Sequence, residues 1–328
     1  MNSNLPTHAI VAVTLNCNSR CVMCDIWKNR VTNELQPEEY LKLPPSLIDI
    51  NITGGEPFLR MDLPEIVFNI KKACPRSRLI LNTNGFLPQV IKKLIPRILE
   101  IDKSFAVRVS IDGWEETHDK IRRIPNGFSL ARQSLRILKD SGIKDLGICF
   151  TIMKDNLHDL PRIHKFSKTE GLQLALTMAV SSPIYFGLGK ESLLPDNHRA
   201  VIKYFNQVII ERYKSIKPKE WFRGWFEEQL LKYYLTHRRS LGCDAGVGFF
   251  YLDSTGNVFT CNIKNWLLGN IRKNQFKEIW NSNTAVQLRV RTANCQDCWL
   301  ICSAKSAMKS ELIKIGSEVL WKKMRHLI

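Results

Sequence analysis

The chain has 328 residues, with 48 Lys and Arg against 31 Asp and Glu, a net charge of +17 and ten cysteines. Hydrophobic residues make up 44 % and charged residues 24 % of the chain, which is ordinary for a globular protein and excludes a disordered or collagen-like one. The length suits one large domain with a smaller domain attached to it.

The sequence carries no segment that predicts export or a membrane span. Residues 1–6 are short and polar without a basic region or a cleavage site, and the most apolar stretch, 172–189, is interrupted by hydroxyl side chains and Pro183. We therefore expect a cytoplasmic protein. In that reducing compartment, clustered thiols more often bind metal or do redox chemistry than form disulfides.

The positive charge is uneven along the chain. Residues 1–180 carry 25 basic and 19 acidic side chains, whereas residues 181–328 carry 23 and 12. A basic surface attracts anionic substrates, anionic lipid, nucleic acid or an acidic electron-donor protein, so the charge alone does not choose a partner.

Short β-branched runs alternate with helical patterns through about the first 180 residues, which is typical of βα units on a parallel sheet. We expect strands at 9–14, 47–52, 78–82, 106–111, 146–153 and 172–179. Apolar residues at helical spacing predict helices at 63–73, 128–140 and 161–169. The fold class is therefore α/β, a partial (β/α)6 barrel of TIM type, with its chemistry at the carboxyl ends of the strands.

Beyond Pro183 the alternation stops. The expected elements are helices at 196–213 and 220–237, a β-hairpin at 249–253 and 258–261, a short helix at 275–282 and one long basic helix at 303–327. We accordingly divide the chain into a barrel core at 1–190, a helical linker at 191–240 and a small α+β domain at 241–328.

Cys17, Cys21 and Cys24 form a CxxxCxxC motif in the loop after the first predicted strand. Three thiolates so close in sequence can hold one face of an iron–sulfur cluster and leave the fourth iron open to another ligand. A zinc site is the alternative. Zinc wants a fourth ligand, however, and the nearest histidine, His8, lies before the strand.

Polar motifs also follow later strands. Gly54, Gly55 and Glu56 come after the second strand, where glycines allow close backbone approach and a carboxylate accepts an ammonium group. Ser110 and Arg122 follow the fourth strand and suit donation to a ribose or a carboxylate. Each motif taken alone is also typical of a turn, a strand end or the surface.

Taken together and in this order, CNSRCVMC, GGEP, LNTNG and VSIDG resemble the motifs of radical S-adenosylmethionine (SAM) enzymes over about the first 180 residues. In that family, three cysteines hold a 4Fe–4S cluster whose open iron chelates the amino and carboxylate groups of SAM. Reductive cleavage of SAM gives a 5′-deoxyadenosyl radical, which takes a hydrogen atom from the substrate.

The resemblance implies roles for individual residues, with Cys17, Cys21 and Cys24 as the cluster ligands. The residues that it places around SAM are Gly54, Gly55 and Glu56 at the ammonium, Ser110 at the ribose, Arg122 at the carboxylate, Asn82, Thr83 and Asn84 along the pocket, and Met153 at the adenine. The family usually has an aromatic residue before the third cysteine. Here it is Met23, whose soft thioether can make the same contact with adenine.

A second cysteine set lies toward the C-terminus and comprises Cys243, Cys261, Cys295, Cys298 and Cys302. Four soft thiolates suit zinc as well as an iron–sulfur cluster, so spacing alone leaves both open. The pattern CxnGxxxxC followed by CxxC resembles the SPASM/Twitch extension of radical SAM enzymes, which carries auxiliary 4Fe–4S clusters. Five thiols imply one auxiliary cluster, on the first four cysteines, with the fifth a competitor or a bystander.

From the single auxiliary cluster we expect oxidation of a small anionic metabolite such as a sugar or cyclitol, with that cluster as electron acceptor. A peptide-modifying SPASM-type enzyme, acting as maturase, epimerase or cross-linking enzyme, is the alternative. A third hypothesis is a metal-stabilised nucleic-acid-binding module, based on the aromatic and basic residues at 221–239. Apolar residues at helical spacing in 303–327 favour a packing helix instead. We expect an acidic electron donor such as flavodoxin or ferredoxin.

Overall fold

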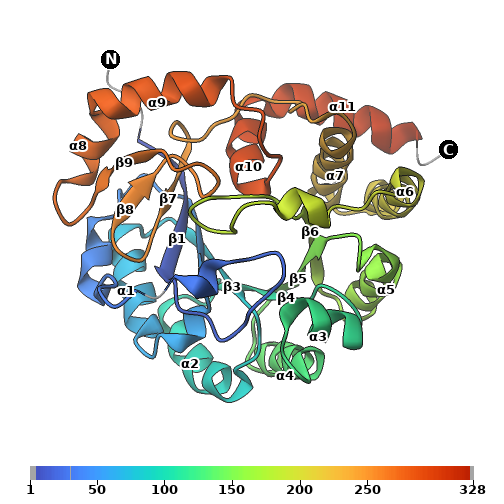
Figure 1. Ribbon diagram of the computed structural model, residues 1–328, viewed down its shortest axis with the longest axis horizontal. Coiled ribbons are helices and arrows are strands. Elements are labelled where there is room, and N and C mark those ends of the chain that lie inside the picture. Colours follow the sequence, from blue (N-terminus) through green and yellow to red (C-terminus); the bar gives the residue numbers. More distant parts are fainter. Residues whose placement is uncertain (1–4, 30, 326–328) are drawn as a thin grey trace.

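The computed structural model describes residues 5–29 and 31–325. Its core is a nine-stranded sheet in the order β6-β5-β4-β3-β2-β1-β7-β8-β9 (Figure 1). The first six strands are β1 (His8–Thr14), β2 (Asp49–Gly54), β3 (Arg78–Thr83), β4 (Ala106–Ser110), β5 (Asp145–Ile152) and β6 (Gln173–Met178). Because neighbours among these six pair in parallel, their carboxyl ends meet at one edge of the sheet.

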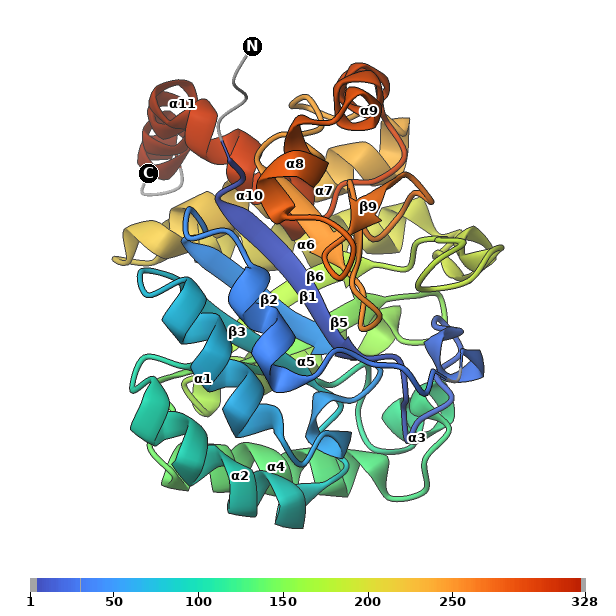
Figure 2. The same ribbon diagram turned by 90° about the vertical axis from the view of Figure 1, so that its left-hand side faces the viewer.

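Helices connect these strands and cover the outer face of the sheet (Figures 1 and 2). They are α1 (Leu63–Ala73), α2 (Pro88–Ile101), α3 (Glu116–Arg122), α4 (Gly127–Asp140) and α5 (Leu160–Thr169). In α1 the apolar stripe that includes Ile66, Val67 and Ile70 is buried, as its helical spacing predicts. The sheet does not close on itself, which confirms the expected partial barrel.

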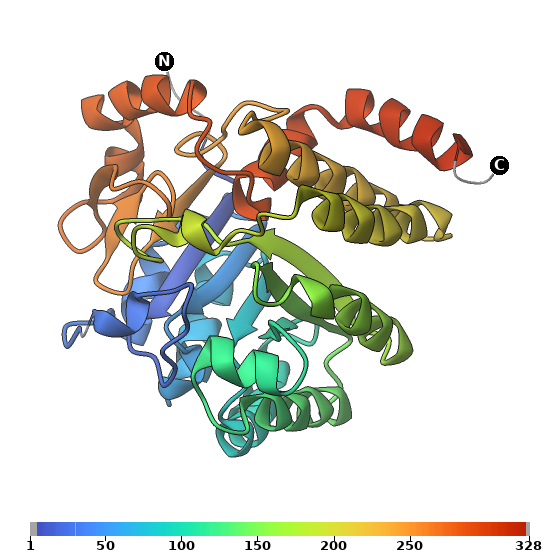
Figure 3. The ribbon, with the colours of Figure 1, turned by 45° about the vertical axis from the view of Figure 1, so that its right-hand side comes forward.

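Short 3-10 helices lie in the connecting loops: η1 (Ile26–Lys28), η2 (Pro37–Lys42), η3 (Pro57–Leu59), η4 (Leu157–Asp159) and η5 (Lys190–Leu193). After β6 the chain forms two long helices, α6 (His198–Lys214) and α7 (Pro218–Thr236), which pack against each other. Figure 3 shows them beside the β6 end of the sheet.

The C-terminal region adds its strands to the opposite edge of the barrel sheet. β7 (Phe249–Leu252) pairs in parallel with β1, and β8 (Asn257–Phe259) and β9 (Leu267–Asn270) continue the sheet in antiparallel fashion. The remaining helices are α8 (Phe276–Asn281), α9 (Asn283–Ala293), α10 (Ile301–Ser310) and α11 (Leu312–Arg325). The predicted hairpin is present, with Gly256 at φ +92° in its turn. The sheet thus brings the second cysteine region next to β1.

The structure differs from the sequence prediction at several elements. The long helix expected at 303–327 is two helices that meet at Glu311, and the last three residues of the chain lie outside the described part. The helix α2 is not among the expected elements; Pro88 opens it and Pro96 lies inside it, although proline usually interrupts a helix. α3, α9 and β9 were also missed.

Within the described residues, none of the helices combines the length and the apolar character that crossing a membrane requires.

Candidate functional site

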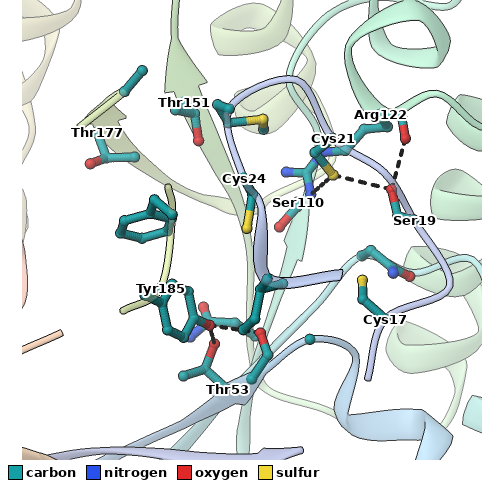
Figure 4. Close-up of a pocket in the computed structure, with 18 of the residues that line it drawn as sticks. Cys17, Ser19, Cys21, Cys24, Thr53, Ser110, Arg122, Thr151, Thr177 and Tyr185 are labelled. Atoms are coloured by element: carbon teal, nitrogen blue, oxygen red, sulfur yellow. Dashed lines mark hydrogen bonds between the residues drawn. The ribbon is translucent and has the colours of Figure 1, made fainter. Parts of the chain in front are cut away.

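The three N-terminal cysteines line one pocket at the carboxyl edge of the parallel strands. Cys17, Cys21 and Cys24 lie in the loop after β1, and their sulfur atoms point toward the same space (Figure 4). Cys21 is buried, and the other two are half-buried. The three thiols therefore line one pocket in the loop where the sequence places their motif, at the end of the barrel where the βα loops gather.

Hydrogen bonds to the end of α3 hold this loop in place. Ser19 Oγ donates to the carbonyl oxygen of Arg122 over 2.7 Å and lies 3.1 Å from Cys21 Sγ, and Val22 N donates to the carbonyl of Ile121 over 3.0 Å. Arg122 Nη1 lies 3.6 Å from Cys21 Sγ. The cysteine loop is thus anchored to residues about 100 positions later in the chain.

Gly54 and Gly55 let the end of β2 approach the cysteine loop. A Cβ atom on Gly54 would lie 2.1 Å from the carbonyl oxygen of Thr14, and one on Gly55 would lie 2.0 Å from that of Asn16. Gly55 N in turn donates to Thr14 O over 2.8 Å. Both glycines line the pocket. The close backbone contact explains why these two positions need glycine.

Glu56 lies behind the pocket wall and is fully buried. Its carboxylate accepts hydrogen bonds from Asn84 N at 2.7 Å, Thr83 Oγ1 at 2.8 Å and Phe58 N at 3.1 Å. Burial raises the pKa of Glu56 to about 7, and these three donors act in the opposite direction. Its present contacts position the loop after β3.

Most of the other predicted SAM contacts line the pocket: Met23, Asn82, Thr83, Asn84, Ser110 and Arg122. Asn84 connects the loop after β3 to the cysteine loop, because its Nδ2 donates to Asn18 Oδ1 over 2.7 Å. Met153 is behind the lining, buried in a small cluster with Cys21 and Met23. Cys74 lies in the main core, and the Cys149 thiol donates to Asn82 Oδ1 over 3.8 Å.

Arg122 is the cation of the pocket and is buried. Its guanidinium pairs with the fully buried carboxylate of Asp112, whose second oxygen accepts from Thr151 N over 2.6 Å. Against the effect of burial, Asp112 and Cys21 raise the pKa of Arg122, so the side chain stays charged. Arg122, which the resemblance places at the SAM carboxylate, thus pairs with the Asp112 carboxylate in the structure.

Sequence reasoning missed the loop after β6. Tyr185 and Phe186 line the pocket, and Tyr185 Oη donates to the carbonyl of Gly54 over 2.7 Å and lies 3.1 Å from Thr53 Oγ1. This loop contains Gly187 and Gly189 but no cysteine, and these glycines did not enter the prediction. Other unpredicted lining residues include Ile26, Thr151, Thr177, Met178 and Leu300.

The five C-terminal cysteines also come together. A hydrogen bond between the thiols of Cys243 and Cys295 lowers the pKa of the first and raises that of the second. Burial raises the pKa of Cys298 to about 11, and burial together with the neighbouring Cys298 and Cys261 raises that of Cys302. Cys302 therefore lies close to Cys261 and Cys298, and which four of the five thiols would hold a cluster stays a prediction.

One apolar cluster spans both cysteine sets. Tyr185, Tyr251 and Phe259 are buried in it, and the partly buried Cys17 and Cys24 pack against it. Cys243, Cys261, Cys298, Cys302 and Leu300 belong to the same cluster. The rings of Tyr185 and Tyr251 lie 5.8 Å apart, and those of Tyr251 and Phe259 lie 5.9 Å apart. Aromatic side chains thus join the two sites.

Two family models match the chain. Residues 11–167 match the radical SAM superfamily, and residues 243–299 match the SPASM domain, described as an iron–sulfur cluster-binding domain. The chain is a radical SAM enzyme with a SPASM domain. The first match covers β1 to α5 with the cysteine loop, and the second runs from Cys243 to Trp299.

Curated relatives match the enzyme over most of their length. Fe-coproporphyrin III synthase of Methanosarcina barkeri (strain Fusaro) is 25 % identical, over 92 % of this chain and 83 % of the relative. AdoMet-dependent heme synthase of the same organism is 28 % identical, over 85 % and 83 %. A structure of anSMEcpe with bound AdoMet and the Cp18Cys peptide has a TM-score of 0.63 at 17 % identity, over 96 % and 99 %, which shows a shared fold.

The residues present fit the cofactors of this family, which are SAM and 4Fe–4S clusters. Three soft thiols face one pocket, a buried cation stands beside Cys21, and a second group of thiols lies in the SPASM domain. Burial raises the pKa of Cys17 and Cys24 to about 12, so cluster binding has to release their protons. Among the residues that the structure describes, no three His, Cys, Asp or Glu side chains are placed to hold one metal ion. An iron–sulfur cluster does not need such an arrangement, because each iron that the protein ligates binds one thiolate.

Proposed function

We propose that this radical SAM enzyme abstracts a hydrogen atom from a C–H bond of an anionic small molecule and oxidises it, and that the substrate is a carboxylated tetrapyrrole. The observation that carries the proposal is that one pocket is lined by residues from both cysteine regions. Its lining runs from Cys17, Cys21 and Cys24 to Leu300, which lies between Cys298 and Cys302 of the second set. A substrate in this pocket would lie next to both cysteine groups.

We assign the SAM cluster to Cys17, Cys21 and Cys24, and one auxiliary cluster to Cys243, Cys261, Cys295 and Cys298. The proximity of Cys302 to Cys261 and Cys298 supports it as the competing fourth ligand. For SAM, we propose contacts with Gly54, Gly55 and Glu56 at the ammonium, Asn82 and Asn84 along the wall, Ser110 at the ribose, Arg122 at the carboxylate, and Met23 and Met153 at the adenine. The lining of the pocket supports most of these positions.

When bound, SAM and the clusters supply the 5′-deoxyadenosyl radical and an acceptor for the electron that the oxidised substrate gives up. The protein positions and shields these partners. Arg122 is already ordered by Asp112, so its guanidinium is preorganised beside the cysteine loop. Tyr185, Phe186 and Leu300 add an apolar wall that excludes water from the reacting centre.

The substrate class rests on the relatives. Two of them are named for Fe-coproporphyrin III and heme, which are flat tetrapyrroles with carboxylate side chains, and each aligns over more than four fifths of this chain. The net charge of +17 suits such an anion. The similar fold of anSMEcpe, whose structure holds a peptide, would suit the peptide alternative. At 17 % identity, however, the similarity supports a shared fold and not a shared substrate.

We also propose a reducing, cytoplasmic setting and an acidic reductant such as flavodoxin or ferredoxin. All ten cysteines are free thiols in the structure, which suits a reducing compartment. The excess of basic side chains in the C-terminal half favours docking of an acidic electron carrier.

Anaerobic reconstitution followed by iron and sulfide analysis tests the cofactor assignment. We expect roughly eight irons per chain and formation of 5′-deoxyadenosine from SAM and dithionite. Replacing Cys17, Cys21 and Cys24 by Ala should leave roughly four irons and abolish 5′-deoxyadenosine. Replacing Cys243, Cys261 and Cys298 should also leave roughly four but preserve uncoupled SAM cleavage. Zinc in the second site would contradict the auxiliary cluster.

The substrate is tested separately, by incubating the reconstituted enzyme with Fe-coproporphyrin III, SAM and reductant and following the tetrapyrrole by mass spectrometry. We expect its conversion together with 5′-deoxyadenosine. If SAM is cleaved and the tetrapyrrole returns unchanged, the substrate assignment fails while the radical chemistry stands. A library of short Cys- or Ser-containing peptides, assayed in parallel, would then examine the peptide alternative.

A further inference from the structure

The C-terminal helix α11 uses one side to pack against the protein. Ile315 and Val319 are buried there, where α11 contacts α6 and α7. On the same side Lys322 pairs with Glu228, and Trp225 Nε1 donates to Glu318 over 2.8 Å. These contacts account for the single apolar stripe that a packing helix needs.

The opposite side of α11 carries a second apolar stripe. Ile313, Leu320 and Met324 are 93 %, 55 % and 58 % exposed, and their spacing of seven and four residues places them on one side of the helix. Trp321, 51 % exposed, lies next to this stripe. We call these four side chains the α11 outer face. Large apolar side chains gathered along one helix face mark an interaction surface more than chance exposure does.

Basic residues border the α11 outer face on its Trp321 side. Lys314 and Arg325 are exposed on its border, and the Arg325 guanidinium carbon lies 4.1 Å from the centre of the Trp321 ring. The helix has a single carboxylate, Glu318, and it faces the packed side through its bond with Trp225. The outer face therefore combines apolar side chains with cations and carries no acid of α11.

The turn between α6 and α7 continues the same pattern. Ile216 is 88 % exposed at its tip, and the exposed Lys214 and Lys217 stand on either side. Lys323 Nζ of α11 donates to the carbonyl of Ser215 over 2.8 Å, so this turn lies beside the C-terminal part of the helix (Figure 3). Two separate elements thus present exposed apolar side chains next to cations.

We propose that the α11 outer face, together with the α6–α7 turn, binds the surface of a bilayer that contains anionic lipids. Apolar side chains with Trp at their border and basic residues around them are the composition of helices that lie in the membrane interface. An anionic headgroup layer complements the cations, whereas a second copy of this chain would bring the same positive charges together.

This placement leaves the pocket free. Lys309 Nζ at the end of α10 lies 3.1 Å from His8 Nε2, at the first residue of β1. α11 therefore continues from the amino end of β1, whereas the cysteine loop follows its carboxyl end. A protein bound to lipid through α11 would keep its substrate pocket turned away from the bilayer. The proposal does not depend on the identity of the substrate.

Co-sedimentation of the reconstituted full chain with vesicles tests the proposal. We expect binding to vesicles that contain phosphatidylglycerol, much weaker binding to pure phosphatidylcholine, and loss of binding at high salt. The combined replacement Ile313→Ser, Leu320→Ser and Met324→Ser should lower the affinity more than about tenfold. Lys314→Gln and Arg325→Gln should each lower it about fivefold.

Leu188→Ser is the matched control, because Leu188 is 71 % exposed on the loop after β6, away from α11, and its replacement should leave lipid binding unchanged. Circular dichroism and gel filtration of every variant separate lipid binding from misfolding and self-association. The proposal is overturned if the wild type binds neither vesicle, if the triple variant binds as well as the wild type, or if the triple replacement converts a dimer to a monomer.

Discussion

Arg272, which follows β9, donates two hydrogen bonds to the carboxylate of Glu39 in η2. Its Nε lies 2.7 Å from Oε1 and its Nη2 lies 2.8 Å from Oε2. The same guanidinium donates to the carbonyls of Asn33 and Glu34 over 3.0 Å each. The Glu34 carboxylate accepts from Thr14 Oγ1 at 2.7 Å, where the cysteine loop begins. A single side chain of the SPASM domain thus supports the segment that carries the cysteine loop.

We expect Arg272→Ala to lower the free energy of unfolding by about 2 kcal/mol, because charge-assisted hydrogen bonds to a partly buried segment are lost. Arg272→Lys should recover less than half, since Lys cannot form the two-pronged contact. Urea titration under anaerobic conditions measures the effect. Arg97→Ala removes an exposed pair with Glu65 and should cost under about 1 kcal/mol. Equal effects of the two Ala variants would contradict the special position of Arg272.

Arg122 and Asp112 form a buried pair, so removing the cation alone leaves an uncompensated carboxylate. We expect Arg122→Gln to destabilise the protein by about 3–5 kcal/mol and to reduce iron content at the first site. The double variant Arg122→Gln with Asp112→Asn should regain part of the stability. Arg123→Gln, at the exposed next position, is the control. A stable Arg122→Gln protein with full iron content would count against this role.

Much of this site could be predicted from local patterns. Cys17, Cys21 and Cys24 are close in sequence, and parallel strands bring Gly54, Asn82 and Ser110 to one edge, so the pocket follows from topology. The position of Glu56 could not be predicted in this way, because the hydrogen bonds that draw it behind the wall come from a later loop.

Long-range pairing explains the other omissions. β7 joins β1 across about 240 residues, and no periodicity within either segment encodes that contact. Tyr185 enters the pocket because the loop after β6 folds back onto Gly54, which again depends on distant residues. The break between α10 and α11 was missed for a different reason, since Glu311 carries no breaker signal and only its backbone marks the interruption.

Gly55 has no room for a side chain, because its ideal Cβ would overlap the carbonyl oxygen of Asn16 at 2.0 Å. We expect Gly55→Ala to lower the free energy of unfolding by about 1–3 kcal/mol and to displace the cysteine loop, reducing cluster content. Gly316→Ala is a matched control: nothing lies within 4 Å of its Cβ position, and helix propensity favours Ala there. Denaturant unfolding of both variants gives the comparison, and equal midpoints would refute the close-approach explanation.

Burial lowers the pKa of His8 from 6.5 to about 4, and the neighbouring Lys309 acts in the same direction. Between these two pH values the unfolded chain binds the proton more readily than the folded chain. The contribution of His8 to stability is therefore complete above about pH 6.5 and is lost as the pH falls toward 4.

Between pH 7 and pH 5, this titration should remove on the order of 2 kcal/mol of stability. In His8→Gln the drop in unfolding free energy over that interval should be smaller by this amount, whatever the absolute stability of the variant. His158→Gln, at a side chain that is 65 % exposed, should keep the wild-type pH profile. An unchanged profile in His8→Gln would show that other groups cause the acid sensitivity.

Arg239 stands beside the second cysteine set. Its guanidinium donates to the carbonyl of Cys298 and to Ser303 Oγ, and Nη1 lies 4.0 Å from Cys298 Sγ. Its charge lowers the pKa of Cys298, although burial outweighs it and raises that pKa to about 11. A cation in this position should stabilise thiolates and the reduced form of a cluster bound by them.

We therefore expect Arg239→Gln to weaken retention of iron at the second site by about 10–100-fold and to make the reduction potential of the auxiliary cluster more negative. Chelator competition and a potentiometric titration followed by electron paramagnetic resonance measure the two effects. Arg238→Gln, at the exposed preceding position, should change neither. Arg239→Lys keeps the charge and should retain the potential better than Gln does. Loss of iron with an unchanged potential would assign Arg239 to packing of the Cys298 loop, through its bonds to backbone, and not to electrostatic control of the cluster.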